Sequence, residues 1–276
     1  MRPETPVQSQ IAPISGPPTV EIVGVPVSVI DYQQTLRWMD DMVARRQRGY
    51  VCVCNVHTVM AAQEDLELRA ALMASPLNVP DGQPLVWAMN ALGQSLHDRV
   101  YGPELMARAC ARAAVNGQRF YLYGGRDQDA LMQLGVGLRR RFPGINIVGG
   151  FAPPFRRLTD EERRAVAEDI NEAEADVVWV GIGVPKQEKW MAHLRPYLEA
   201  PVLVGVGAAF DFLAGLVPQA PPTLQKAGLE WAYRFAQEPR RLWRRYLRYN
   251  PRFVVAFARQ LVAHRAAGEQ SRIPYQ

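Results

Sequence analysis

A single carboxylate, Asp81, stands between a short apolar run and the first turn of an expected helix in the stretch "LNVPDGQPLVW", residues 77–87. Gly82 follows it, and Pro84 lies just inside the helix. A carboxylate at a helix start accepts hydrogen bonds from free N–H groups, and proline is common in the first turn, so the stretch taken alone favours a structural cap. A carboxylate at a strand end can also act as a general base on a hydroxyl group. Both interpretations stay open.

Glycine-rich and polar stretches also follow other apolar runs that we expect to be strands. They are "NVHT" at 55–58, "YGGRD" at 123–127, "GIGVPKQE" at 181–188 and "GVGAAFD" at 205–211. Ligands of open α/β sheets bind beyond the carboxyl ends of the strands, so these loops are the place to look for a site. Short βα loops need glycine whatever the function, so for any one loop the structural interpretation has equal weight.

Familiar cofactor motifs are incomplete. "GIGVPK" and "GVGAAF" supply the first two glycines of a dinucleotide-binding fingerprint, but Lys186 and Phe210 occupy the place of the third. No GxxxxGK[ST] loop occurs, and the four histidines lack the spacing of zinc ligands. The "DQD" at 127–129 has the form of the DxD motif that holds a cation in many glycosyltransferases. It falls at an expected helix start, however, where helix capping is favoured.

The elements that must position these residues follow an alternating pattern. Expected strands cover about 20–30, 50–56, 119–123, 145–149, 176–182 and 201–207, and expected helices cover 31–46, 57–74, 84–92, 103–116, 127–142, 159–174 and 186–199. Asp31, Thr159 with Glu162, and Pro185 mark three of the helix starts. Alternating strands and helices predict an α/β fold with a largely parallel, Rossmann-like sheet flanked by helices.

Composition limits the class of protein. The 276 residues are 48% hydrophobic and 21% charged, as expected for a soluble globular protein. Residues 1–18 hold five prolines and no apolar periodicity, and we expect a disordered tail there without a secretory signal. No apolar run reaches the length of about 18 residues that a membrane span needs. Cys52 and Cys54 lie in an apparent buried strand and form no CxxC pair, which suits a reducing cytoplasm.

Basic charge is concentrated at the C-terminus. Residues 223–276 carry a net charge of +8, against −3 for residues 1–222. In "PRRLWRRYLRY", helical spacing puts an apolar set on one face and an arginine set on the other, namely Leu242, Trp243, Tyr246 and Leu247 against Arg240, Arg241, Arg244, Arg245 and Arg248. A following helix has Phe253, Phe257 and Leu261 on one stripe. We expect 19–222 to be the catalytic domain and 223–276 to be a basic amphipathic appendage that lies on a membrane, in preference to binding nucleic acid.

Several motifs, in this order, resemble the WecG/TagA/CpsF glycosyltransferases, glycosyltransferase family 26. They include "NVHTVMAAQEDLELRAAL", "LNVPDGQPLVW", "RVYGPELM", "VGIGVPKQEKW", "GVGAAFDFLAG" and "PPTLQKAGLEWAYRFAQEPRRLWRRYL", and the likeness covers about residues 20–255. The resemblance implies an inverting hexosyltransferase at the cytoplasmic face of the inner membrane, bound peripherally. Such enzymes move a sugar from a UDP-sugar to a polyprenyl-diphosphate-linked saccharide without a DxD-bound metal or other cofactor.

The resemblance also implies roles for individual residues. The family's proposed catalytic base corresponds to Asp81, and its substrate-binding residues correspond to Asn55, Arg99 and Gln187, with Gly124, Gly125 and Lys186 placed beside them. Arginines thought to close over the diphosphate correspond to Arg234, Arg241 and Arg244. Arg99 and Gln187 alone would be ambiguous, since an isolated loop arginine or first-turn glutamine is usually solvated. Val53 stands where the family often has a threonine, so sugar preference is expected to differ from that of N-acetylmannosamine-transferring members.

The wording "VCVCNVHTVMAA" looks closest to the GumM branch of xanthan-type β-1,4-glucosyltransferases, which act in exopolysaccharide assembly. UDP-glucose is the donor expected on that basis. The alternative within the family is transfer of N-acetylmannosamine or its uronic acid. The alternative of another class is a nucleotide-sensing membrane adaptor that keeps the fold without catalysis.

Overall fold

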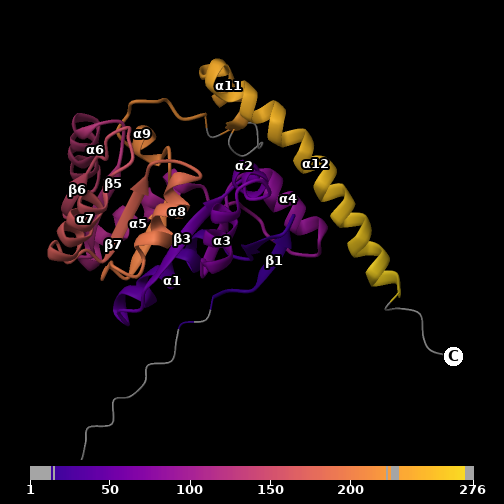
Figure 1. Ribbon diagram of the computed structural model, residues 1–276, viewed down its shortest axis with the longest axis horizontal. Helices are drawn as coiled ribbons and strands as arrows, with labels where there is room; N and C mark the ends of the chain where they lie inside the picture. The colour runs from indigo at the N-terminus through magenta and orange to yellow at the C-terminus, as the bar shows by residue number, and fades with distance from the viewer. Residues whose placement is uncertain (1–13, 15, 222, 225–229, 271–276) are drawn as a thin grey trace, which may run out of the picture.

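The computed structural model describes residues 14, 16–221, 223–224 and 230–270 (Figure 1). Its centre is a six-stranded parallel sheet in the order β4-β3-β8-β7-β5-β6. The strands are β3 (Gly49–Cys54), β4 (Leu77–Pro80), β5 (Arg119–Gly124), β6 (Asn146–Phe151), β7 (Val177–Gly181) and β8 (Val202–Gly205). This architecture confirms the expected α/β fold.

Helices cover both faces of the sheet because its central strands are apolar on both sides. One core lies under α2 (Val56–Ala61), α3 (Leu66–Ala74), α4 (Gln83–Ala91), α7 (Asp160–Glu172) and α8 (Lys186–Leu194). The other lies under α1 (Tyr32–Ala44), α5 (Gly102–Asn116), α6 (Gln128–Arg141) and α9 (Ala209–Leu213). Strand β3 shows the reason, since all six of its residues are buried.

The helix caps expected from the sequence are present. Asp31 and Thr159 each form a capping box, the latter with Glu162. The Asp127 carboxylate accepts a hydrogen bond from the backbone N–H of Ala130 at 2.8 Å, so the capping interpretation of "DQD" is confirmed for that residue.

Two expected elements differ, and one strand was not expected. The strand at 20–30 is a hairpin outside the main sheet, formed by antiparallel β1 (Thr19–Ile22) and β2 (Val25–Ser28), because Val23 and Gly24 turn the chain with φ of 47° and 73°. The helix at 57–74 is divided into α2 and α3, since Asp65 caps a new helix by accepting from the N–H of Leu68. Strand β4, with only four residues, was not among the expected strands.

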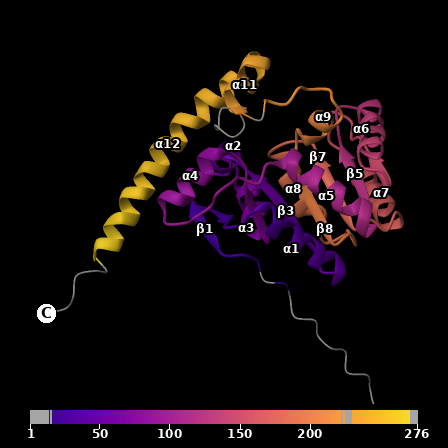
Figure 2. The same ribbon diagram turned by 180° about the vertical axis from the view of Figure 1, so that it is seen from behind.

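Two helices follow the α/β body at the C-terminus, α11 (Glu230–Gln237) and α12 (Pro239–Gln270). Where two helices were expected after residue 239, the structure has one, with Pro251 inside it. Helix α12 runs along one side of the body, next to α2 and α4 (Figures 1 and 2), and it contacts α2. No helix in the described part of the chain combines the length and apolarity that a membrane crossing requires.

Candidate active site

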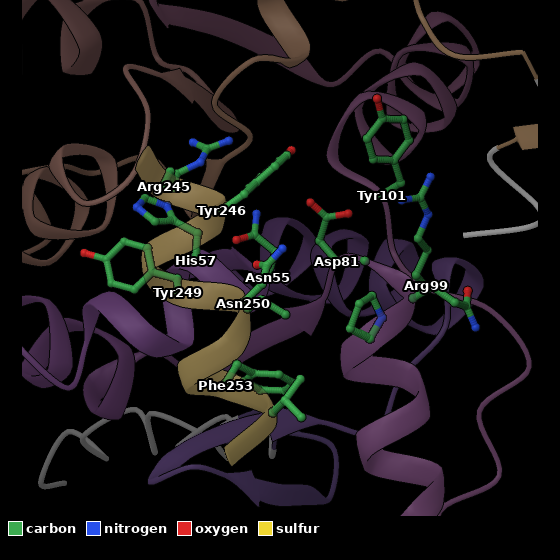
Figure 3. A pocket seen from close by; sticks show the side chains of 15 residues that line it. Asn55, His57, Asp81, Arg99, Tyr101, Arg245, Tyr246, Tyr249, Asn250 and Phe253 are labelled. Carbon is green, nitrogen blue, oxygen red and sulfur yellow. The ribbon is translucent and has the colours of Figure 1, made fainter. Parts of the chain in front are cut away.

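A cavity of about 310 Å³ opens at the carboxyl ends of β3 and β4, with α12 forming one wall (Figure 3). This volume is at the lower end of the range of roughly 300–1,000 Å³ that is typical of small-molecule sites. The lining residues are Asn55, Val56, His57, Asp81, Gly82, Gln83, Pro84, Arg99, Tyr101, Arg245, Tyr246, Tyr249, Asn250, Phe253 and Val254. The cavity therefore brings three predicted site residues, Asn55, Asp81 and Arg99, together with residues of α12.

Strand register places Asn55 beside Asp81. Cys54 of β3 pairs with Pro80 of β4, so the next residue of each strand leaves the sheet at the same level. The backbone N–H of Asp81 donates to the carbonyl oxygen of Cys54 at 2.6 Å, which extends the ladder by one bond. Two short buried strands thus deliver an amide and a carboxylate to one point of the sheet edge.

Asp81 is not the N-cap residue of α4. That position is occupied by Gly82, which has no side chain to make a cap hydrogen bond. Gly82 has a φ of 98°, a conformation that glycine adopts without strain. The glycine turns the chain directly after Asp81, and the half-buried carboxylate faces the cavity (Figure 3).

Asn55 serves both the fold and the cavity. Its side-chain oxygen caps α2 by accepting from the N–H of Thr58 at 3.2 Å. Because the cap uses the amide oxygen, the amide nitrogen is the part of this side chain that can donate to a ligand.

Arg99 and Tyr101 enter the cavity from the segment before α5. The N–H of Val100 donates to the carbonyl oxygen of Pro80 at 2.7 Å, and Val100 is fully buried. Alternation along this extended segment sends Arg99 and Tyr101 to the other side, where the guanidinium carbon of Arg99 lies 4.5 Å from the centre of the Tyr101 ring. Arg99 is only 9% exposed, so its charge lies in a partly desolvated environment, where its interaction with an anion is stronger than in bulk water.

Helix α12 adds groups that the sequence prediction did not assign to the site. Arg245, Tyr246, Tyr249 and Asn250 line the cavity opposite Asp81 and Arg99 (Figure 3). Their spacing puts all four on one face of the helix. Periodicity alone could not reveal this role, since it assigned Tyr246 to the apolar face and Arg245 to the arginine face.

His57 was also missed, although "NVHT" was singled out as a strand-end loop. Burial, reinforced by the nearby charge of Arg245, lowers the pKa of His57 from 6.5 to about 4. The imidazole is therefore neutral at pH 7, and it leaves Arg99 and Arg245 as the cationic side chains among the described lining residues.

The remaining predicted substrate residues lie outside the cavity lining. Gly124 is at the end of β5, and a Cβ there would meet the backbone of Gly181 at 2.6 Å, so the close approach of β5 and β7 requires this glycine. Gly125 follows it, with its N–H donating to the carbonyl oxygen of Gly181 at 3.2 Å. Lys186 is exposed at the start of α8.

Gln187 is 2% exposed and its amide is held by the protein. Its oxygen accepts from the N–H of Gly183 at 3.2 Å, and its nitrogen donates to Glu188 at 2.9 Å. Burial raises the pKa of Glu188 to about 7. The "PKQE" motif thus fixes the loop after β7, and Gln187 does not line this cavity.

The predicted diphosphate-binding arginines are placed differently from one another. Arg244 is exposed on α12, with its guanidinium carbon 5.4 Å from a ring centre of Trp243, and it does not line the cavity. Its neighbour Arg245 does. The side chains of Arg234 and Arg241 lie outside the described part of the chain.

The geometry can support transfer to a hydroxyl group with an anionic leaving group. A carboxylate at the cavity floor can accept a proton, while two guanidinium groups on opposite walls can stabilise developing negative charge. No group of three His, Cys, Asp or Glu residues arranged to hold a metal ion is found within the described ranges.

The chain matches the model of the family described as "Glycosyl transferase WecG/TagA/CpsF family" over residues 20–267. The match includes the α/β body and the part of α12 that lines the cavity. It extends beyond residues 20–255, over which the motifs resemble this family.

Proposed function

The chain belongs to the WecG/TagA/CpsF family of glycosyltransferases, and we propose that its cavity transfers glucose from UDP-glucose to a saccharide on a polyprenyl diphosphate. The observation that carries the proposal is the meeting of Asp81 with Arg99 and Arg245 in one cavity. One of these cations comes from the helix that also presents a basic outer surface, which suits an acceptor held in a membrane.

Asp81 is proposed as the general base. Its carboxylate takes the proton of the acceptor hydroxyl, whose oxygen forms a bond to the anomeric carbon of the donor sugar. The bond from that carbon to the β-phosphate oxygen breaks, and UDP leaves with the electron pair. Attack on the face opposite the leaving group inverts the anomeric configuration.

Arg99 and Arg245 are proposed to take up the charge of the leaving diphosphate. Arginine binds phosphate oxygens through two parallel N–H groups, and partial burial strengthens that interaction. We propose that these cations do the work that a divalent metal does in DxD transferases, so that UDP-sugar is the only small molecule the reaction needs. Lys186, Gly124 and Gly125 are left as candidates for donor contacts along the neighbouring strand ends.

The outer surface of α12 is proposed to rest on the cytoplasmic face of the inner membrane. Trp243, Leu247, Val254 and Val262 are 44%, 67%, 65% and 70% exposed, and spacings of four, seven and eight residues keep them on one side. Exposed arginines, among them Arg240 and Arg244, flank this stripe. An apolar stripe with flanking arginines is typical of helices that lie in an anionic membrane interface.

Val53 bears on the choice of donor sugar. Val53 is 5% exposed and packs against Gly102, outside the cavity lining. A threonine hydroxyl at this position would therefore lie in the core and not in the cavity. The test uses a panel of UDP-sugars with a glucosyl-diphosphate lipid and mass spectrometry of the product. A gain of one hexose is expected in exopolysaccharide-type synthesis, whereas a gain of one N-acetylhexosamine or its uronic acid would favour the alternative within the family.

A further inference from the structure

One attachment of helix α12 to the α/β body is a carboxylate that receives three donors. Glu64, in the turn between α2 and α3, accepts from Arg248 at 2.7 Å and from the Tyr249 hydroxyl at 3.4 Å. It also accepts from Arg252 through its other oxygen. The bond from Arg252 is the main reason that the pKa of Glu64 is lowered, so the carboxylate is charged at neutral pH.

A second attachment lies further along α12, at the β1–β2 hairpin. The side-chain amide of Gln260 donates to the carbonyl oxygen of Glu21 at 2.6 Å and accepts from the N–H of Val23 at 2.8 Å. Gln63, adjacent to Glu64, donates to the carbonyl oxygen of Val23 at 2.7 Å. The hairpin turn and the Glu64 turn are therefore tied to each other and to the same helix.

Apolar contacts fill the space between the two attachments. Phe253 is 6% exposed, belongs to the core under α2, and stacks with Phe257 at a ring-centre distance of 6.0 Å. Such contacts favour docking but leave the register of a helix weakly defined, because a neighbouring apolar residue can replace one that slides away. Directional polar bonds define the register.

Register matters because the cavity residues of α12 lie within one turn of the Glu64 partners. Arg245 is three residues before Arg248, and Tyr249 contacts Glu64 while lining the cavity. A slip of one helical turn displaces a side chain by about 5.4 Å, enough to take the Arg245 guanidinium out of hydrogen-bond range of a ligand.

We propose that Glu64 is a positioning residue that sets the register of α12 and so places Arg245 and Tyr249 over the active site. The inference rests on the proposed transferase function. Glu64 also engages the charges of Arg248 and Arg252, which reduces the positive charge that α12 offers to a membrane.

The test replaces and then restores the charge pair in the full-length protein. Glu64→Arg puts like charges together, and Glu64→Gln keeps the size but removes the charge. The double variant Glu64→Arg with Arg252→Glu restores an ion pair in which the two charges have exchanged positions. Glu174→Arg is the matched control, because it breaks the exposed ion pair with Arg119 far from the cavity. Thermal unfolding of each variant shows whether the α/β body still folds.

Two readouts follow the register and the reaction separately. Hydrogen exchange of residues 245–257 reports docking of α12, and steady-state kinetics report transfer from UDP-glucose to the lipid acceptor. We expect faster exchange and a kcat lowered about tenfold in Glu64→Arg, because Arg245 is displaced from the leaving diphosphate. A change of about threefold is expected in Glu64→Gln because an exposed ion pair is weak, with recovery in the swapped pair.

The outcomes distinguish this inference from the proposed function. Unchanged exchange in Glu64→Arg, faster exchange with unchanged kinetics, or no recovery in the swapped pair would each overturn the positioning role. Absence of transfer in the wild type, with the exchange pattern as expected, would instead contradict the transferase proposal and leave the docking role of Glu64 intact.

Discussion

His57 and Tyr249 meet edge to face, with ring centres 5.1 Å apart and planes at 61°. The pair joins α2 of the α/β body to α12, so the surroundings of His57 depend on the docked helix. Edge-to-face aromatic pairs contribute about 0.5–1.5 kcal/mol beyond the area they bury, which makes this contact a modest part of docking. Its value is that an imidazole proton signal can report the position of α12.

Acidification is expected to weaken docking. The pKa of His57 is lowered from 6.5 to about 4 by burial and by Arg245, so the undocked state binds a proton more readily between these values. The contribution of neutral His57 to docking is therefore fully present above about pH 6.5 and is lost as the pH falls towards 4. NMR titration should give a His57 pKa near 4 in the wild type and a value closer to 6.5 in Glu64→Arg. Equal values in both would contradict coupling of His57 to α12.

Replacement of the proposed base separates catalysis from binding. Asp81→Asn keeps the shape of the side chain but cannot accept the acceptor proton, so kcat should fall by about 10²–10⁴-fold. Affinity for UDP, measured by calorimetry, should change little. A non-catalytic adaptor would show no transfer in the wild type, and full activity of Asp81→Asn would rule out the base role.

Arg245 and Arg244 give a matched pair on α12. Arg245 lines the cavity and Arg244 does not, so Arg245→Ala should lower kcat by about 10²-fold through loss of charge stabilisation in the transition state. Arg244→Ala should leave kcat close to the wild-type value with a detergent-solubilised acceptor. A larger loss of kcat in Arg244→Ala than in Arg245→Ala would instead assign the diphosphate contact to Arg244, as the family resemblance implies.

The exposed stripe of α12 should bind anionic membranes. Leu247→Glu removes an apolar residue that is 67% exposed and adds a negative charge, so co-sedimentation with vesicles containing phosphatidylglycerol should fall several-fold. Val115→Glu, at a residue of α5 that is 90% exposed, serves as the control and should bind as the wild type does. Equal binding by both variants would argue against this surface.

The sheet and the floor of the cavity could be predicted from the sequence because they depend on local patterns. Strand β3 is a continuous apolar run, and ligands bind beyond such strand ends, so the loop that contains Asn55 could be singled out, whereas the role of Asn55 itself came from the family resemblance. Asp81 was found in the same way, although β4 was too short to stand out as a strand. That Asp81 is not the N-cap residue depends on the turn at Gly82, which spacing does not define.

The α12 wall could not be predicted from helical periodicity. Apolar spacing identified the stripe of Phe253, Phe257 and Leu261, but the same spacing suits a lipid surface and a protein surface equally well. In the structure this stripe packs against the body, while Trp243 and Leu247 are left exposed. Likewise Gln187 was expected at the substrate, and only the three-dimensional arrangement reveals that Gly183 and Glu188 hold its amide.

The burial of Phe253 affects the interpretation of shortened forms of the protein. Its ring packs into the apolar core beneath α2, so a chain that ended before α12 would expose that apolar surface to water. Exposed apolar patches promote self-association. Activity lost on removal of the helix would then combine missing arginines with a changed oligomeric state, and sedimentation measurements are needed before such a loss is assigned to catalysis.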